Sequence, residues 1–379
     1  MNWIKKEIEH LPIDIIDGDR GLNYPKLNEF YENEHCLFLN TSNVTLTGFN
    51  FTKCQFINIE KDEKLRKGKL KRNDVVLTTR GTLGNSGFYS ENIVFENIRI
   101  NSGMVLLRSK NTEELDPFYI YYSIRESNFQ TQIANARSGS AQPQLPIGTL
   151  KKLTISKPPL ATQRKIVSIL SAYDNLIENN LKRIKLLEDK ARIEFKSIQK
   201  NEKLEIKKAV EVLQFTTGKL NSNAAIKNGL YPFFTCGQEI LRTNTFSVDE
   251  EVVLLGGNNA SAIYPVFYYK GKFDAYQRTY IIKPKPEINI SFRYLYFFWE
   301  DKLDYLKNIS TGAATKFLTL KILNDIDVPL PNKKIMDGYE KLTDPIFKLI
   351  AILVEQNTKL REARDILLPR LMNGQIEVS

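Results

Sequence analysis

The feature that most constrains this chain is an internal repeat: the second half of the sequence repeats the pattern of the first. Ser138-Gly139-Ser140-Ala141 returns as Thr311-Gly312-Ala313-Ala314, an offset of 173 residues. Further along, Asn180 returns as Asn357 at an offset of 177 residues. A solenoid repeat runs about 20 to 50 residues, so this much longer period indicates two copies of one large unit. Such a chain can present two similar surfaces to a target that itself has two halves.

Length and charge narrow the class of protein. The chain has 379 residues, enough for about two to three domains. Its net charge of +10 favours a polyanionic partner, with nucleic acid first and an anionic membrane surface second. Three cysteines are an odd and sparse set that fits a reducing cytoplasm rather than a disulfide framework. No apolar run approaches the roughly 20 residues of a membrane span, and we expect a cytoplasmic protein without a signal peptide.

The pattern of each copy predicts a globular part followed by a long helix. We expect residues 1–155 and 201–331 to be globular, and residues 156–200 and 332–379 to be helical. β-Branched and aromatic runs between Gly, Asn and Pro predict strands, and two short helices are expected in matching places. The strands are Asp74–Thr79, Gly103–Leu107, Glu251–Leu255 and Arg278–Ile282, and the helices are Pro117–Asn128 and Phe292–Leu306. The predicted fold class is mixed α/β (α+β) with a pseudo-two-fold internal repeat.

The two long helices carry apolar residues in alternating steps of four and three, which is the seam of a coiled coil. The first seam includes Ile166, Leu170, Ile177, Asn180, Ile184 and Leu187, and the second includes Leu349, Leu353, Gln356, Leu360 and Leu367. A polar residue in the middle of each seam, Asn180 or Gln356, is expected to fix the register.

The simplest arrangement packs these helices antiparallel with one globular part at each end. Helices of roughly 37 residues would be about 55 Å long, enough to hold two DNA-reading modules about one duplex turn apart. A dimerisation arm without a spacing role remains the alternative. Pro345 should break or kink the second helix, and Asp344 could cap a new helix there.

Basic and flexible segments point to nucleic acid. The stretch Lys61–Arg72 is dense in cations suited to phosphate contacts, although a solvated turn is an equal reading. Its candidate contact residues are Lys64, Arg66, Lys67, Lys69, Lys71 and Arg72. A glycine loop follows the predicted strand in each copy, and Arg favours guanine whereas Asn suits adenine. The candidates are Thr79, Arg80, Thr82 and Asn85 in the first copy, and Gly257, Asn258, Asn259 and Ser261 in the second.

A second pair of loops is small, hydroxylated and rich in glycine. Such loops suit close approach to a sugar-phosphate backbone, although their glycines could serve only to make a turn. The residues are Arg137, Ser138, Gly139 and Ser140 in the first copy, and Thr311, Gly312, Thr315 and Lys316 in the second. Gln277 and Arg278 are further candidates, and the matching first-copy segment is Asn101–Gly103.

Motifs for catalysis are missing from the sequence. Lys157-Pro158-Pro159-Leu160 has a lysine where an adenine methyltransferase needs Asn or Asp, and it lacks the aromatic residue. There is no Pro-Asp dipeptide to open a nuclease motif and no phosphate-binding glycine loop. His35, Cys36 and Cys54 lack a fourth zinc ligand, so no metal site is expected. The chain is predicted to bind rather than catalyse.

Two motifs carry a family resemblance. The first is Pro158–Val167, which leads into Asn175–Asn180, and the second is Leu360–Ile376 near the C-terminus. Together with the order module, helix, module, helix, they resemble the specificity (S) subunit of Type I restriction-modification systems over essentially the whole chain. Thr162 departs from the Glu that this family usually has before Gln163, and Pro331–Lys334 lacks the usual Glu-Gln pair.

The resemblance implies a concrete function. Each globular part would be a target recognition domain that reads one half of a split, asymmetric site in double-stranded DNA. The helices would set the gap and dock two methyltransferase (M) subunits, which restriction and translocase (R) subunits then join. The assembly would use S-adenosylmethionine, ATP and Mg²⁺, and this chain would bind none of them. The alternatives are a coiled-coil adapter that binds protein, and a specificity subunit of a related modification-only phage-defence system.

Overall fold

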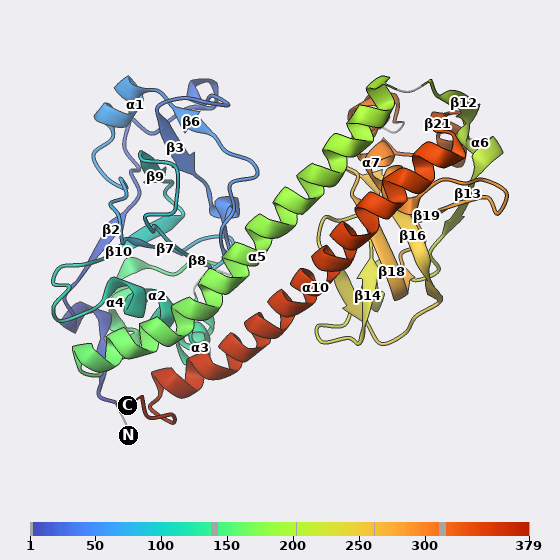
Figure 1. Cartoon of the computed structure of the whole chain (residues 1–379). Helices are drawn as coiled ribbons and strands as arrows, with labels where there is room; N and C mark the ends of the chain where they lie inside the picture. Colours follow the sequence, from blue (N-terminus) through green and yellow to red (C-terminus); the bar gives the residue numbers. More distant parts are fainter. Residues whose placement is uncertain (1–2, 138–142, 202, 261, 311–315, 379) are drawn as a thin grey trace. The chain divides into compact units, whose positions relative to one another are not determined.

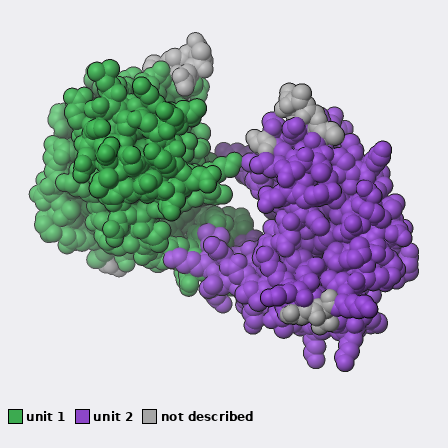
Figure 2. All heavy atoms as spheres, turned by 90° about the horizontal axis from the view of Figure 1, so that it is seen from above, with its two compact units in different colours: residues 1–179, 356–379 green, residues 180–355 purple. Residues whose placement is uncertain are grey.

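The computed structural model describes residues 3–137, 143–201, 203–260, 262–310 and 316–378. The chain forms two compact units, residues 1–179 with 356–379 and residues 180–355, called here the first and second unit (Figure 2). Each unit contains one globular domain and part of both long helices, α5 (Leu160–Asn201) and α10 (Lys333–Met372). No helix in the described part of the chain combines the length and the apolar character needed to cross a membrane.

The first unit is built on a four-stranded antiparallel sheet in the order β2-β10-β7-β8. Helices α2 (Pro117–Arg125), α3 (Ser127–Ala136) and α4 (Ile147–Lys152) lie on one side of this sheet, and a smaller three-stranded sheet with α1 (Ile59–Lys64) lies on the other (Figure 1). The strands are β2 (Ile13–Asp17), β7 (Val75–Thr78), β8 (Ser86–Phe88) and β10 (Met104–Ser109), with β3 (Cys36–Leu39), β6 (Phe56–Ile57) and β9 (Ile98–Ile100) in the smaller sheet. Short pairs join β4 (Val44–Thr45) to β5 (Gly48–Phe49) and β1 (Lys5–Glu7) to β11 (Thr154–Ser156).

The second unit repeats this plan with a six-stranded sheet in the order β13-β19-β16-β18-β14-β15. Its strands are β13 (Leu213–Thr217), β14 (Tyr231–Phe234), β15 (Leu241–Thr243), β16 (Val248–Gly256), β18 (Val266–Ala275) and β19 (Thr279–Pro284). Its helices are α6 (Ala209–Val212), α7 (Phe292–Asp301), α8 (Leu303–Ile309) and α9 (Leu320–Asn324), and short pairs join β12 (Glu205–Lys208) to β21 (Asp327–Leu330) and β17 (Asn258–Asn259) to β20 (Lys316–Phe317).

Both main sheets are buried on two faces, which explains their continuous apolar strands. In β7, Val75 and Leu77 face the helices while Val76 faces the smaller sheet. In β16, Val253 and Leu255 face the helices while Val252 lies in a separate cluster on the other side. Alternate residues of a strand point to opposite faces, so an apolar residue is required at every position. The predicted mixed α/β fold is confirmed.

The short predicted helices are each divided in two. The first breaks at Glu126, whose extended backbone ends α2 and whose carboxylate caps α3 by accepting from Phe129 N. The second breaks at Lys302, between α7 and α8. At Glu126 a side-chain cap competes with continuation of the helix, whereas Lys302 keeps helical backbone angles and has no side-chain cap.

The long helices complete the core of each unit. In the first unit, Ile166 and Leu170 of α5 and Leu371 of α10 join the cluster beneath α2. Asp174 Oδ1 accepts a hydrogen bond from Arg364 Nη1 at 2.6 Å, and Ile177 O accepts one from Asn357 Nδ2 at 3.4 Å. The residue number rises along α5 as it falls along α10, so the helices run antiparallel in this unit, as predicted.

One prediction for the second helix is wrong, and the helix break predicted as one outcome at Pro345 is absent. Gln356 is exposed and Asn357 is buried, so the buried polar residue of α10 is the one that matches Asn180 in the repeat. Pro345 does not break α10, which is helical from Lys333 to Met372. Pro345 is exposed, while Ile346 and Phe347 beside it pack into the core of the second unit, and this packing offsets the lost backbone hydrogen bond.

Candidate nucleic-acid interface

Three segments that are distant in the sequence meet at one end of the main sheet of the first unit. The loop after β7 begins at Thr79, whose N–H donates to Gly103 O at 2.8 Å. Thr79 O in turn accepts from Leu145 N at 2.9 Å, and Arg80 pairs with Gln144 in an isolated β-bridge. These contacts join the loop after β7, the turn before β10 and the segment before α4, and we call this place the first junction.

The second unit builds the same junction with the same backbone bonds. Gly257 N donates to Arg278 O at 2.8 Å, and Leu318 N donates to Gly257 O at 2.8 Å. The short strands β17 and β20 then pair Asn258 with Phe317 and Asn259 with Lys316. The structure therefore brings together the predicted residues of the second unit that are described here: Gly257, Asn258, Asn259, Gln277, Arg278 and Lys316. We call this place the second junction.

Equivalent positions of the two junctions carry different side chains. Arg80 in the first junction corresponds to Asn258 in the second, and Gly103 corresponds to Arg278. The Arg278 guanidinium lies over the Phe317 ring, 5.3 Å from its centroid, which holds an exposed cation in a defined place. Asn258 Oδ1 is buried and has no hydrogen-bond partner in the described part of the chain. A shared backbone thus presents two chemically distinct sets of donors and acceptors.

Two other loop residues, Thr79 and Asn85, hold the first junction in place through hydrogen bonds. Thr79 is buried and its hydroxyl donates to Gly103 O at 3.1 Å. Asn85 Nδ2 donates to Val44 O at 2.9 Å, which ties the hairpin to β4. Gly81 and Thr82 are exposed at the tip, where Gly81 has a φ of 70° that favours glycine. The structure therefore leaves Thr82 exposed and Arg80 half-buried, and uses Thr79 and Asn85 to hold the loop.

The basic stretch Lys61–Arg72 divides into cations that pair within the domain and cations that do not. Lys61 pairs with Glu29 at 2.6 Å, and Lys69 is also paired although its side chain is 44% exposed. Lys69 Nζ lies 2.5 Å from Asp62 Oδ2, and Arg99 also binds this buried carboxylate. Burial alone would raise the pKa of Asp62, but the hydrogen bonds from Lys69 and Arg99 hold it below its usual range. Arg72 Nη1 donates to the carbonyls of Ser90 and Ile93 at 2.7 and 2.9 Å. Both Lys69 and Arg72 are therefore engaged within the domain.

The remaining cations of this stretch reach the surface. These residues are Lys64, Arg66, Lys67 and Lys71, and all four are exposed. Arg137 is also exposed, at the end of α3. The predicted contacts at Ser138, Gly139, Ser140, Ser261, Thr311, Gly312 and Thr315 lie outside the described residues. The sequence prediction missed Gln144, Phe317 and Arg20. The repeat could have revealed Gln144 and Phe317, because each lies near the repeated glycine loop and directly before a matching leucine, Leu145 or Leu318.

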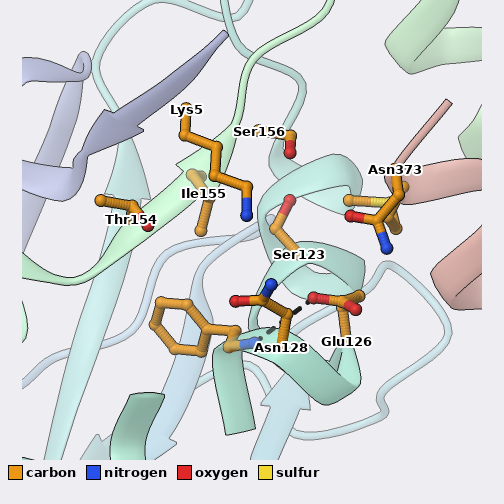
Figure 3. A pocket seen from close by; sticks show the side chains of 10 residues that line it. Lys5, Ser123, Glu126, Asn128, Thr154, Ile155, Ser156 and Asn373 are labelled. Carbon is orange, nitrogen blue, oxygen red and sulfur yellow. Dashed lines mark hydrogen bonds between the residues drawn. The ribbon is translucent and has the colours of Figure 1, made fainter. Parts of the chain in front are cut away.

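A small hollow in the first unit lies between β1, β11, α2 and the end of α10. Lys5, Ser123, Glu126 and Asn373 surround it (Figure 3). Its free space is about 20 Å³, which fits roughly one water molecule. Because Glu126 already caps α3, the hollow is a structural crevice rather than a ligand site.

Comparison with known proteins decides the family. Residues 14–189 and again residues 201–357 match the family described as "Type I restriction modification DNA specificity domain". This chain belongs to that family. The expected family is thereby confirmed; the Pro158–Val167 motif lies within the first match, whereas Leu360–Ile376 follows the second, and one match falls in each copy of the repeat.

Individual members of the specificity family show how far the similarity extends. The EcoDI specificity subunit of Escherichia coli is 32% identical over 170 residues, which cover 44% of this chain and 37% of that protein. The putative MjaX specificity subunit of Methanocaldococcus jannaschii is 26% identical over 372 residues, 87% of this chain and 84% of that protein. The crystal structure of an S subunit from M. genitalium has the same fold, with 18% identity, a TM-score of 0.56, and coverage of 100% of this chain and 97% of that one.

Proposed function

We propose that this chain is the DNA-recognition subunit of a Type I restriction-modification complex, in which each unit binds one half of a bipartite, asymmetric site. The observation that carries the proposal is the pair of junctions, which keep the same backbone hydrogen bonds while exchanging Arg80 for Asn258 and Gly103 for Arg278. A common scaffold with different side chains is what reading two different sequences with one fold requires.

Side-chain chemistry assigns a preference to each junction. The Arg80 guanidinium forms no hydrogen bond or salt bridge with a residue in the described ranges, so its donors are available for the two acceptors of guanine. Asn258 carries both a donor and an acceptor, the pair that matches the major-groove edge of adenine. Its Oδ1 is buried without a partner in the described part of the chain, so the side chain would turn outward to make this contact. The exposed cations Lys64 and Lys71, and the half-buried Lys316 of the second junction, would contact phosphates and contribute affinity without reading sequence.

The long helices would serve as the spacer and as the docking site for partners. Their outward faces carry exposed apolar side chains, including Leu176 at 52%, Leu186 at 69% and Ile366 at 54% exposure. Apolar side chains on a helix face that does not meet its own domain are suited to burial against another subunit. Two methyltransferase subunits are the proposed partners, followed by the restriction and translocase subunits.

This chain would act in the cytoplasm as a non-catalytic subunit. The methyltransferase subunits would bind S-adenosylmethionine, and the restriction and translocase subunits would bind ATP and Mg²⁺. Specificity would then arise from this chain, while the chemistry at adenine and at the phosphodiester bond would belong to its partners.

A selection experiment tests the proposal. The chain, assembled with its methyltransferase subunit, is incubated with a random duplex library, and the bound DNA is sequenced. Two short preferred blocks separated by a fixed gap are expected. Arg80→Ala should relax one block and Asn258→Ala the other, so that each variant is the control for its counterpart. Bound sequences without two blocks, or variants that relax both blocks together, would contradict the proposal.

A further inference from the structure

A hollow of about 270 Å³ follows the end of β2 in the first unit, lined by Asp17–Gly21 together with Arg66 and Lys67. About 10–15 Å³ of such free space admits one water molecule, so this open hollow admits many. It is therefore large enough for a hydrated phosphate group, unlike the one-water crevice near the C-terminus. The sequence drew attention to the two cations but not to the loop that faces them.

The backbone around the hollow is fixed by two close contacts. A Cβ at Gly18 would lie only 2.2 Å from Asn101 O, so no larger residue fits where this loop meets the turn before β10. Gly68 has a φ of 81°, and a Cβ there would lie 3.2 Å from Gly18 Cα. The loop Asp17–Gly21 and the segment that carries Arg66 and Lys67 are thus held against each other.

The acidic groups of the hollow are occupied by internal partners. The Asp19 carboxylate is buried and accepts from Gly21 N and Arg66 N, each at 2.8 Å. The hydrogen bond from Gly21 N holds the pKa of Asp19 below its usual range. Asp17 Oδ1 accepts from Arg20 Nη2 at 3.1 Å. Both acids therefore shape the loop, and their two negative charges are outnumbered by the three cations that line the same hollow.

The cations of the hollow are open to solvent. Arg66 and Lys67 are exposed, and neither forms a salt bridge with another residue in the described part of the chain. The Arg20 side chain is 46% exposed, and its Nη2 also reaches Ser102 O at 3.3 Å. Three cations against two acids leave the hollow with a net charge of +1, and Arg66 and Lys67 are exposed beside it.

The hollow adjoins the first junction through a shared turn. Arg20 contacts Ser102, and the next residue, Gly103, accepts the Arg80 N–H in the junction. In the second unit the matching loop takes another course: Leu220 N donates to Ala275 O, and Gln277 N donates to Leu220 O. In the second unit the backbone of Leu220 therefore binds the turn, whereas in the first unit the Arg20 side chain binds the corresponding turn.

We propose that Arg20, Arg66 and Lys67 form a phosphate-binding subsite that takes a backbone phosphodiester of DNA beside the first half-site. This inference rests on the proposed function and adds an asymmetry to it, because the first unit would have a built phosphate anchor next to its junction. The anchor would contribute affinity and salt dependence but no base preference.

Salt-dependent binding of a random-sequence duplex to the full-length chain tests the subsite. The test variant is Arg66→Gln/Lys67→Gln, which changes exposed side chains and leaves the Arg66 N–H and the Lys67 carbonyl in place. The matched control is Lys151→Gln/Lys152→Gln, another exposed neighbouring pair in the same unit. This control pair lies at the end of α4, which packs against the 3₁₀ turn Ile8–His10. That turn precedes the start of β2, whereas the hollow follows the end of β2, so the control pair lies away from the hollow. Equal thermal unfolding of all three proteins shows that the fold is intact.

The subsite predicts a change in slope. Between about 50 and 200 mM KCl, loss of one phosphate contact should reduce the slope of log K against log salt by about 0.9, while the control keeps the wild-type slope. An unchanged slope in the test variant, with salt-dependent binding by the wild type, overturns the subsite and leaves the proposed function standing. A wild type without salt-dependent binding overturns the proposed function itself. If inorganic phosphate stabilises the wild type but not the test variant while their DNA slopes agree, the hollow takes free phosphate and the inference is wrong.

Discussion

Gln163 offers a sharp test of how the family motif holds the first unit together. This residue of the Pro158–Val167 motif has no exposed surface. Its Oε1 accepts from Asp116 N at 3.0 Å, and its Nε2 donates to Glu114 O at 3.1 Å and to Pro158 O at 2.9 Å. Asp116 in turn caps α2 by accepting from Phe118 N and Tyr119 N. One side chain therefore joins the start of α5 to the start of α2.

The expected loss of stability follows from these three bonds. A hydrogen bond contributes about 1 kcal/mol net, and a buried group left unpaired costs up to about 3 kcal/mol. Gln163→Ala should therefore reduce the free energy of unfolding of the first unit by about 3 kcal/mol. Arg164→Ala is the matched control, because the adjacent Arg164 side chain is 53% exposed and its partner Glu113 is 76% exposed. A surface change of this kind stays within about 0.5 kcal/mol.

Gln163→Glu separates hydrogen bonding from packing. The substitution keeps the size of the side chain and the acceptor for Asp116 N, but it turns a carboxylate oxygen toward the carbonyls of Glu114 and Pro158. Burial and these carbonyls raise the pKa of the introduced carboxyl group. The destabilisation relative to wild type should therefore be large at pH 8 and should diminish toward pH 5, where the protonated acid donates one bond again.

The assay must read the two units separately, since a chain with two domains need not unfold in one step. Hydrogen exchange in increasing urea, followed in peptides from α2 and from α7, gives a stability for each unit. The loss is expected in α2 alone. A loss below about 1 kcal/mol for Gln163→Ala, or an effect of Gln163→Glu that does not change with pH, would refute the reasoning.

Two further predictions concern charged groups on or against the long helices. Burial raises the pKa of Glu188 on α5 and of Glu300 on α7. Protonation therefore stabilises the folded second unit below their ordinary value of 4.5, and this contribution is lost as the pH rises through the raised folded pKa. The thermal midpoint of the second unit should rise from pH 7.5 to pH 5, and Glu188→Gln should flatten that dependence, unlike Glu287→Gln at an exposed site. Asp174→Ala removes the acceptor of Arg364, whose side chain is 12% exposed, and should destabilise the first unit by about 2 kcal/mol in urea unfolding; an effect below about 0.5 kcal/mol would contradict it.

Much of the fold could be predicted because burial imposes a period on the sequence. Strands such as Asp74–Thr79 and Glu251–Leu255 are apolar at successive positions, and the structure places β7 and β16 there. The predicted seam of α10 is wrong at the position of its buried polar residue. Counting four and then three residues from Leu349 reached Gln356, whereas the buried stripe advances four from Leu353 to Asn357. A helix with 3.6 residues per turn drifts against a strict heptad, and the repeat at 177 residues was the better guide.

The interface was harder to predict, because its geometry comes from contacts between distant segments. Nothing local in Gln144 or Phe317 indicates that they pair with the loops at Arg80 and Asn258. Charge density was misleading in part, since Lys69 and Arg72 look like free cations in the sequence and are engaged by Asp62 and by backbone carbonyls. The sequence shows which residues are basic, but only tertiary packing decides which of them face solvent.

Methylome sequencing of a host that expresses this chain with its methyltransferase subunit tests the central claim most directly. We predict one split motif with methyladenine in each half, and a motif in which Arg80→Ala relaxes one half while Asn258→Ala relaxes only the other. A single uninterrupted motif, or no new methylation when both proteins are folded and associated, would contradict the account that two units of one repeat each read half of a DNA site.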